Sequence, residues 1–155
     1  MRRHEKEVTD PMALERIIDK ASVCRLGLFD TETGVPYIVP LSFGYQDGMF
    51  VFHAAETGYK IDLLKRGGKI AFEIDNVLGL VRRERACGWT MRYQSIIGWG
   101  NVRFIEAVEE KKQALQMLLN HYGTGQFFLA DKDVERTTVF ALHVKEMRGK
   151  TSEPN

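Results

Sequence analysis

The sequence predicts an all-β dominated (β+α) fold, in which about six antiparallel strands form a small barrel flanked by two or three helices. Three observations predict it. Apolar and polar residues alternate with a period of two over much of the chain, as in half-buried strands. Short turns that contain glycine separate these stretches, which is typical of hairpins. Helical periodicity is limited to a few stretches, and closing the sheet would remove its exposed edges.

Composition and charge describe an ordinary folded domain. The chain has 155 residues, and we expect a single domain over residues 1–155 with loose termini at residues 1–9 and 149–155. Its 22 Lys and Arg residues balance 21 Asp and Glu residues, which gives no electrostatic reason to expect a nucleic acid or a membrane as a partner. No apolar run approaches the roughly 20 residues that span a bilayer, and the charged N-terminus does not resemble a secretory signal.

The cysteines and histidines show no metal-binding pattern. Cys24 and Cys87 lie far apart and form no C-x-x-C pair, which argues against a disulfide framework or a zinc site. Cys24 lies inside an apolar strand and is expected to be a buried small hydrophobe. The four histidines share no ligand spacing, so we expect no metal site. The expected location is the reducing cytoplasm.

One helix is expected near the N-terminus. Asp10 is a good N-cap, and Pro11 suits the first helical position. The apolar residues that follow recur at i, i+3, i+4 and i+7 as far as Ala21, which gives one buried stripe on a helix of about 10–12 residues.

Three strands are expected next, joined by hairpin turns into an antiparallel meander. The second of them contains Pro36 and Pro40, and proline in a strand indicates a sheet edge, a bulge or a broken stretch because it cannot donate to a ladder. The strands are expected at residues 22–29, at 35–43 and from 49 onward, with turns at 30–34 and 46–48.

The second half of the chain predicts three further strands and a second long helix. Gly98 and Gly100 fall in the middle of the longest strand and mark a bend or a close approach of another segment. Residues 76–88 carry three arginines and are expected to form a loop. The strands are expected at residues 70–75, 89–105 and 137–145, and the helix at 108–122.

The stretch Met49–Leu64 is the feature on which the functional prediction is built. An apolar strand runs through a turn of small residues into a short helix that starts near Tyr59. Unpaired N–H groups at the helix start, the Thr57 hydroxyl and the Lys60 ammonium suit a phosphate. Gly58 lets the backbone approach a ligand closely. An ordinary strand-to-helix junction is the alternative interpretation of this stretch.

The usual catalytic signatures are absent from the sequence. There is no nucleophile elbow, Walker loop, H-E-x-x-H motif or dinucleotide-binding glycine pattern. What remains is a set of polar and aromatic residues near strand ends, which a planar ligand lying along the sheet would contact. The set comprises Pro40, Leu41, Ser42, Phe52, His53, Thr90, Tyr93, Gln94 and Ser95.

Three segments carry a resemblance to a known family. They are V-P-L-S-F at Val39–Phe43, M-F-V-F-H-A-A-E-T-G-Y-K at Met49–Lys60 and C-G-W-T-M-R-Y-Q-S-I-I-G-W-G at Cys87–Gly100. Together they resemble the pyridoxamine 5′-phosphate oxidase-like, FMN-binding split β-barrel family, and within it the nitroimidazole-reductase-like (Nim-type) flavoproteins. The similarity extends over residues 10–150. It implies a six-stranded antiparallel split β-barrel in a homodimer, with two FMN molecules at the subunit interface and a small-molecule substrate.

The resemblance also implies a role for each matching residue. Val39, Pro40, Leu41 and Ser42 would line the isoalloxazine ring through backbone and hydroxyl contacts. Beside the ring and ribityl chain would lie Phe52, His53 and Ala54, and at the phosphate Tyr59 and Lys60. The partner subunit would contribute Gln94, Ser95 and Ile96. With a flavin beside it, His53 becomes the expected proton donor, because imidazole titrates near neutral pH.

Two positions depart from the family's namesake enzymes. The true pyridoxamine oxidases bind their substrate's phosphate with an arginine before the ring-binding strand and with a C-terminal W-R-x-R run. The corresponding positions in this chain are Tyr37-Ile38 and Met147–Lys150. Pyridoxamine phosphate is therefore not the expected substrate.

Three hypotheses for the function follow. The first is an FMN-dependent oxidoreductase that passes electrons from a reduced nicotinamide to a small electron-poor acceptor, such as a nitroaromatic compound. The second is a haem- or flavin-binding sensor or storage protein without turnover, in which His53 or His143 is a haem ligand. The third is an interaction domain with an empty barrel. A deazaflavin would make ring contacts similar to those of FMN.

Overall fold

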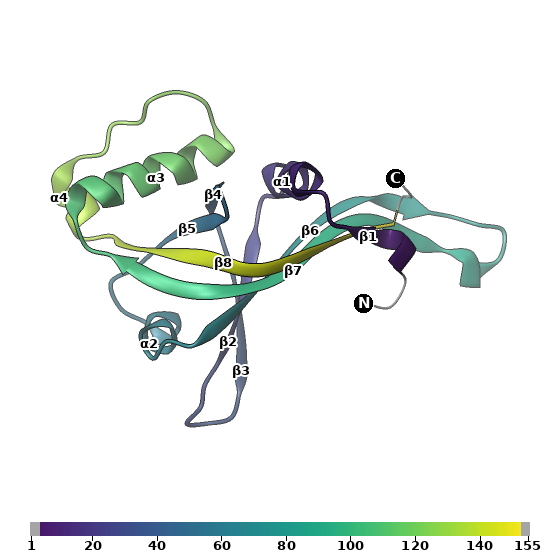
Figure 1. The fold of residues 1–155 in the computed structure, drawn as a ribbon, viewed down its shortest axis with the longest axis horizontal. Coiled ribbons are helices and arrows are strands. Elements are labelled where there is room, and N and C mark those ends of the chain that lie inside the picture. The colour runs from purple at the N-terminus through teal and green to yellow at the C-terminus, as the bar shows by residue number, and fades with distance from the viewer. Residues whose placement is uncertain (1–3, 153–155) are drawn as a thin grey trace.

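The computed structural model describes residues 4–152, which form one antiparallel sheet with four α-helices around it (Figure 1). The strands are β1 (Glu7–Val8), β2 (Cys24–Phe29), β3 (Pro36–Leu41), β4 (Gly44–Gln46), β5 (Met49–Ala54), β6 (Lys69–Val81), β7 (Thr90–Ile105) and β8 (Thr138–Thr151). The helices are α1 (Pro11–Asp19), α2 (Tyr59–Lys65), α3 (Val108–Tyr122) and α4 (Asp131–Glu135), and two short 3₁₀ turns occupy His4–Lys6 and Ala86–Gly88.

The sheet curls into a split barrel, as expected, although it has eight strands rather than six. Its strand order is β3-β2-β6-β7-β8-β5-β4, with β1 added to β8. The two strands at the ends of this order, β3 and β4, are consecutive in the chain and are joined only by Ser42 and Phe43. This short covalent link brings the two ends of the sheet together, while no ladder pairs β3 with β4 among the described strands.

The bend at Ser42–Phe43 corrects the expected meander. Residues 35–43 were expected to form one strand, but the chain stops pairing with β2 after Leu41 and pairs with β5 from Gly44 onward. Tyr122 at the end of α3 holds the bend: its Oη accepts a hydrogen bond from Phe43 N (2.9 Å) and donates one to the Ser22 carbonyl (3.0 Å). Since Phe43 is fully buried, the bend is also anchored in the core.

Two hydrophobic clusters lie on opposite faces of the curled sheet. The larger one fills the barrel with stacked and tilted aromatic rings, and α1 and α2 close it with apolar side chains. The smaller one packs α3 against β5 and β8, where Ala114 and Leu118 meet Val51, Val139 and Ala141. Because strand side chains alternate between faces, β5 and β8 contribute to both clusters.

The glycines in β7 allow close approaches, as their position in a strand predicts. A Cβ on Gly98 would lie 2.5 Å from the Glu146 carbonyl oxygen, and one on Gly100 would lie 2.3 Å from that of His143. The register between β7 and β8 shifts between Trp99 and Gly100, so the long strand bends there. The bend lets one strand, β7, belong both to the barrel and to the hairpin that it forms with the end of β6.

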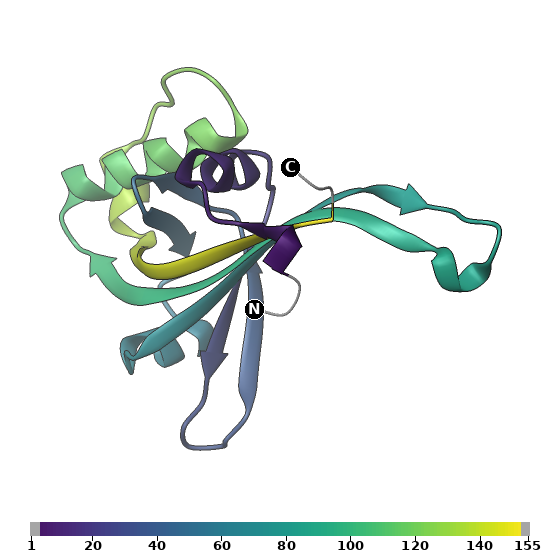
Figure 2. The ribbon, with the colours of Figure 1, turned by 45° about the vertical axis from the view of Figure 1, so that its right-hand side comes forward.

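A two-stranded arm replaces most of the loop expected at residues 76–88. β6 continues to Val81, and the first residues of β7, Thr90–Tyr93, pair in the ladder with β6 alone. This hairpin, the β6–β7 arm, projects away from the barrel in both views (Figures 1 and 2). The sequence predicted a loop that carries three arginines, but Gly79 takes a φ of 133° at a bulge and lets the ladder continue past it.

The ends of the sheet are more ordered than expected. Residues 1–9 and 149–155 were expected to be loose, yet β1 pairs Glu7 with Lys150 and Val8 with Gly149. Val8 is buried there, because its side chain packs into the large cluster beside α1. The outermost residues, 1–3 and 153–155, lie outside the described part of the chain. Within residues 4–152, no helix combines the length and hydrophobicity needed to cross a bilayer.

Replacing Gly44 by alanine is expected to destabilise the fold. The added Cβ would lie 2.6 Å from the backbone nitrogen of Leu118, so β4 and α3 would have to separate. Overpacking of this kind costs about 1–3 kcal/mol in the free energy of unfolding, measured by urea denaturation. Gly123→Ala is the matched control, because its nearest new contact would be 3.5 Å. Equal stability of the two variants would contradict the close packing of β4 on α3.

Candidate functional site

Three of the segments predicted to bind the ligand are neighbours in the structure. Tyr37 of β3 packs edge-on against Tyr59 at the start of α2, with ring centroids 5.1 Å apart. Inside the barrel, the side chains of Val39 and Leu41 on β3 share one cluster with Phe52 and Ala54 of β5. The edge strand, the end of β5 and the start of α2 therefore form one continuous region, as the resemblance implies.

The free edge of β3 presents acceptors and few donors. The bond from Asp30 N to the Val35 carbonyl (3.1 Å) starts the ladder with β2, and alternate residues of β3 then turn their backbone groups away from β2. Those residues are Pro36, Ile38 and Pro40. Since proline has no N–H, the edge offers carbonyl oxygens to a ligand and lacks two of its donors. Pro40 and Ser42 are exposed beside this edge.

His53 lies on the face of β5 opposite to Phe52. Phe52 is buried in the barrel, whereas the His53 side chain is exposed at a pocket of about 210 Å³ between β5, α3 and α4. Leucines from α3 and the following segment form most of the wall, and Asp133 and Thr137 add polar groups. An imidazole beside an apolar pocket can donate a proton to a small ligand bound there.

Lys60 is a free cation at the start of α2. It is half-buried, and within residues 4–152 it forms no ion pair. The turn before it is open: Gly58 takes a φ of 134°, and a Cβ added there would meet no atom within 4 Å. The first N–H groups of the helix also lack intrahelical partners. This arrangement suits an anionic group.

Tyr59 makes a hydrogen bond within the protein, at the start of α2. Its Oη donates to Asp30 Oδ2 (2.7 Å), and the same carboxylate accepts from Arg66 Nη1 through Oδ1 (2.6 Å). Backbone N–H of Glu32 (2.9 Å) and the hydroxyl of Thr33 (3.0 Å) also donate to it. Asp30 is 2% exposed, and these hydrogen bonds, chiefly that from Tyr59, hold the pKa of its carboxyl well below the usual range.

The three residues expected on β7 do not share one face. Ile96 is buried in the barrel, and Gln94, two residues away, points to the same side. Gln94 Oε1 is buried without a hydrogen-bond partner among the described residues, so it can accept a bond from a bound group. Ser95 points to the opposite face, directly across from Asp75 on β6 and Lys150 on β8.

The other side of this sheet is an exposed apolar surface, here called the outer face. Cross-strand pairing places Ile38, Gly27, Ala71 and Trp99 in one row across four strands. The face also includes Phe29 and Ile97, and Ile38 and Ile97 are 69% and 64% exposed. Exposed apolar surface of this kind marks an interaction site more often than a solvated surface.

An ion-pair group borders the outer face. Arg25 bridges Glu73 (2.9 Å) and Asp75 (2.5 Å) across β2 and β6. These two hydrogen bonds raise the pKa of Arg25, so the guanidinium stays charged. The group leaves one negative charge on this part of the sheet.

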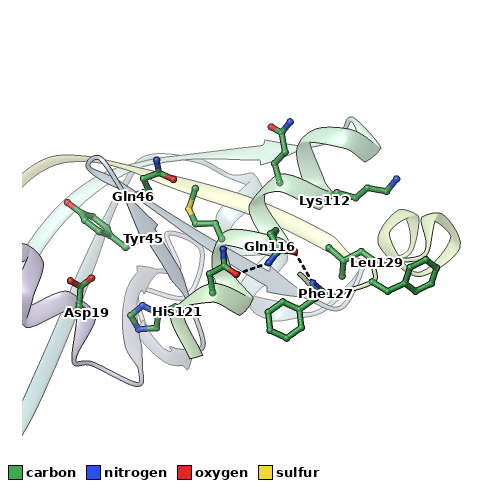
Figure 3. Close-up of a pocket in the computed structure, with 12 residues that line it drawn as sticks. Asp19, Tyr45, Gln46, Lys112, Gln116, His121, Phe127 and Leu129 are labelled. Carbon is green, nitrogen blue, oxygen red and sulfur yellow. Dashed lines mark hydrogen bonds between the residues drawn. The ribbon is translucent and has the colours of Figure 1, made fainter. Parts of the chain in front are cut away.

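A larger hollow lies elsewhere, between β4, α3 and the segment of residues 123–130 (Figure 3). It holds about 870 Å³ and is lined by amides, aromatic rings and His121. Gln116 organises one side, since its amide donates to Asn120 Oδ1 (2.7 Å) and accepts from Phe127 N (3.2 Å), as the dashed lines show. None of the residues predicted to bind the ligand lines this hollow, although Leu129 borders both it and the His53 pocket.

Sequence reasoning missed Asp30, Arg66 and Asp133. Asp30 is the first residue of the turn Asp-Thr-Glu-Thr-Gly, where an aspartate commonly accepts a hydrogen bond from the backbone N–H two residues on. Nothing in that pattern indicates that it also bonds to residues of a helix.

Within residues 4–152, no three His, Cys, Asp or Glu side chains come together in a way that could hold a metal ion. Cys24 is buried as expected, and burial raises the pKa of its thiol to about 12.

Comparison with solved structures identifies similar proteins. A candidate 5-nitroimidazole antibiotic resistance protein from Bacteroides thetaiotaomicron is 35% identical, with 93% of this chain and 85% of that chain covered and a TM-score of 0.83. An FAD- and haem-binding protein from Mycobacterium smegmatis is 22% identical over 97% of this chain and 76% of that one, with a TM-score of 0.85.

A third similar structure is the flavocytochrome Anf3 from Azotobacter vinelandii, which is 20% identical over 99% of this chain and 72% of that chain, with a TM-score of 0.85. At this level of identity, it and the mycobacterial protein share the fold alone. A comparison with proteins of curated function gave no significant match. The model of one protein family, described as pyridoxamine 5′-phosphate oxidase, matches residues 10–151. The chain therefore belongs to the pyridoxamine 5′-phosphate oxidase-like family.

Proposed function

We propose that the protein binds FMN and acts as an oxidoreductase, passing electrons from a reduced nicotinamide to a small electron-poor acceptor. One observation carries the proposal: the free edge of β3, the end of β5 and the unpaired cation Lys60 form one region, joined by the contact between Tyr37 and Tyr59. These segments match the ring side and the phosphate side of a single cofactor in this family.

The residues present suit FMN. Lys60 supplies a positive charge for the phosphate, and the open turn at Gly58 leaves room for it. The carbonyl oxygens at the free edge of β3, those of Pro36, Ile38 and Pro40, are available to the N–H group of a flavin ring. Gln94 Oε1 is a buried acceptor still without a partner among the described residues, and such a group is expected to have one.

In this proposal FMN, when bound, supplies the hydride and electron chemistry, while the protein supplies orientation, charge and access. The imidazole of His53 donates a proton to the reduced acceptor from a ring nitrogen. The leucines around its pocket exclude water and favour a small apolar or aromatic molecule. A nitroaromatic acceptor fits this pocket, and the name of the 35% identical relative supports that choice.

The outer face supports a homodimer in which FMN lies between the two subunits. Its apolar row crosses four strands. In a two-fold dimer, the outer face of a second copy would cover this row and remove it from water. In this arrangement Ser95, which points to the outer face, belongs to the shared interface.

A haem- or flavin-binding protein without turnover is the second candidate. The exposed imidazoles of His53 and His143 favour it, and two of the similar structures are named for haem-containing proteins. A Soret band on titration with haem, lost in a His53→Ala or His143→Ala variant, would support this candidate over the first.

The protein as isolated is expected to show flavin absorbance, or to gain it on addition of FMN. Lys60→Ala should weaken FMN binding about 10- to 100-fold, since a charge-assisted contact contributes about 1.5–3 kcal/mol. Riboflavin, which lacks the phosphate, should bind both proteins equally well in fluorescence titrations. Lys65→Ala, an exposed lysine of the same helix, is the control. A protein that is colourless as isolated and gains no flavin absorbance when FMN is added would contradict the proposed function.

His53→Gln is expected to lower turnover at least about 100-fold, as loss of a general acid does, while FMN affinity stays the same. Steady-state oxidation of NADH or NADPH with a nitroaromatic acceptor measures turnover, and flavin fluorescence measures affinity. His143→Gln, an exposed histidine on β8, is the control and should retain full activity. Undiminished turnover in His53→Gln would exclude His53 as the proton donor.

Ile97→Glu is expected to weaken the dimer at least about tenfold, because it would bury an unpaired charge at the interface. Analytical ultracentrifugation across a concentration series measures the dissociation constant. Phe128→Ser is the control, since Phe128 is 93% exposed but lies outside the outer face. A wild-type protein that stays monomeric at micromolar concentration would argue against the shared site.

A further inference from the structure

The carboxylate of Asp30 holds both ends of α2. Tyr59 is the first residue of the helix, and Arg66 follows its last residue, so the two contacts lie two turns apart. A carboxylate has about four lone-pair positions, and all four are taken by Glu32 N–H, the Thr33 hydroxyl, Tyr59 and Arg66. We call this set of contacts the Asp30 clamp.

The helix needs such a restraint. α2 has seven residues, which is too short to be stable by itself, and its N-cap residue Gly58 provides no side-chain hydrogen bond. Its apolar residues Ile61, Leu63 and Leu64 bury one face in the barrel. The Asp30 clamp adds hydrogen bonds outside that face, at both ends of the helix.

The clamp also settles which side chain is available to a phosphate. Tyr59 is committed to Asp30, and the hydrogen bond to that carboxylate raises the pKa of its hydroxyl. Arg66 is committed to Asp30 and to Glu32 (3.2 Å). Lys60, the neighbour of Tyr59, makes neither kind of contact. Successive helix residues point about 100° apart, so fixing Tyr59 and Arg66 also fixes the direction of Lys60.

We propose that Asp30 is a positioning residue for the cofactor: by holding Tyr59 and Arg66, it orients α2 so that Lys60 faces the FMN phosphate. This inference rests on the proposed function, because it assumes that FMN binds at this site. Tyr59 then serves the clamp and makes no contact with the phosphate, in contrast to what the family resemblance implies.

A double-mutant cycle between Asp30→Asn and Lys60→Ala tests the proposal. The amide replaces one carboxylate oxygen by an NH2 group, so either Tyr59 or Arg66 loses its acceptor, and the clamp should open at that end while the turn keeps its size. Asp30→Asn is expected to weaken FMN binding about fivefold or more, which is a smaller loss than that expected for Lys60→Ala. Riboflavin binding should stay unchanged. The double variant should bind FMN no more weakly than Lys60→Ala alone, since Asp30 acts through Lys60.

Two results would overturn the proposal. Additive losses in the double variant would mean that Asp30 acts independently of Lys60, and equal losses for FMN and riboflavin would mean general damage to the fold. Tyr59→Phe should reproduce the Asp30→Asn effect without adding to it. Glu110→Gln on α3, which breaks the ion pair with Arg103 of β7, is the matched carboxylate control and should leave both affinities unchanged.

A measurement without cofactor separates failure of this proposal from failure of the proposed function. In cofactor-free Asp30→Asn, amide hydrogen exchange should become at least about tenfold faster in α2 and stay unchanged in α3. Unchanged exchange in α2 would overturn the clamp even if FMN binds. Faster exchange in a protein that binds neither FMN nor riboflavin would support the clamp and reject the FMN assignment.

Discussion

The bend at Ser42–Phe43 is the constraint on which the rest of the structure depends. It lets one continuous stretch of chain provide both edges of the sheet, so the barrel curls without a closing ladder. Tyr122 satisfies the backbone N–H of Phe43 at the bend, and Gly44 brings β4 against the backbone of α3. The position of α3 over β5, and with it the wall of the His53 pocket, follows from the same short link.

Alternation along β5 then divides the site between two compartments. Phe52 belongs to the barrel interior, and His53 belongs to the pocket under α3. One ligand cannot lie flat against both side chains, because they point to opposite faces of one strand. A flavin would have to meet this region at the strand end, through backbone groups and the turn that leads to Lys60.

Residue patterns predicted the parts of this structure that local physics determines. The N-cap at Asp10, the two long amphipathic segments and the close approach at Gly98 and Gly100 are properties of single segments, and all are confirmed. After Leu41 the chain stops pairing with β2 and begins to pair with β5, and distant groups such as Tyr122 hold this bend. The expected meander was therefore wrong. Likewise, the Asp30 clamp joins residues 29 and 36 positions apart, and no local pattern could indicate it.

The prolines of β3 have a further consequence for how the protein can associate. An open sheet edge normally invites a strand from another chain, which leads to runaway polymerisation or amyloid-like stacking. Pro36 and Pro40 turn their nitrogens toward that edge, so an incoming strand would find two of its carbonyls without a donor. The two prolines therefore oppose edge-to-edge growth, which has no natural end, whereas they leave face-to-face contacts of the sheet unhindered.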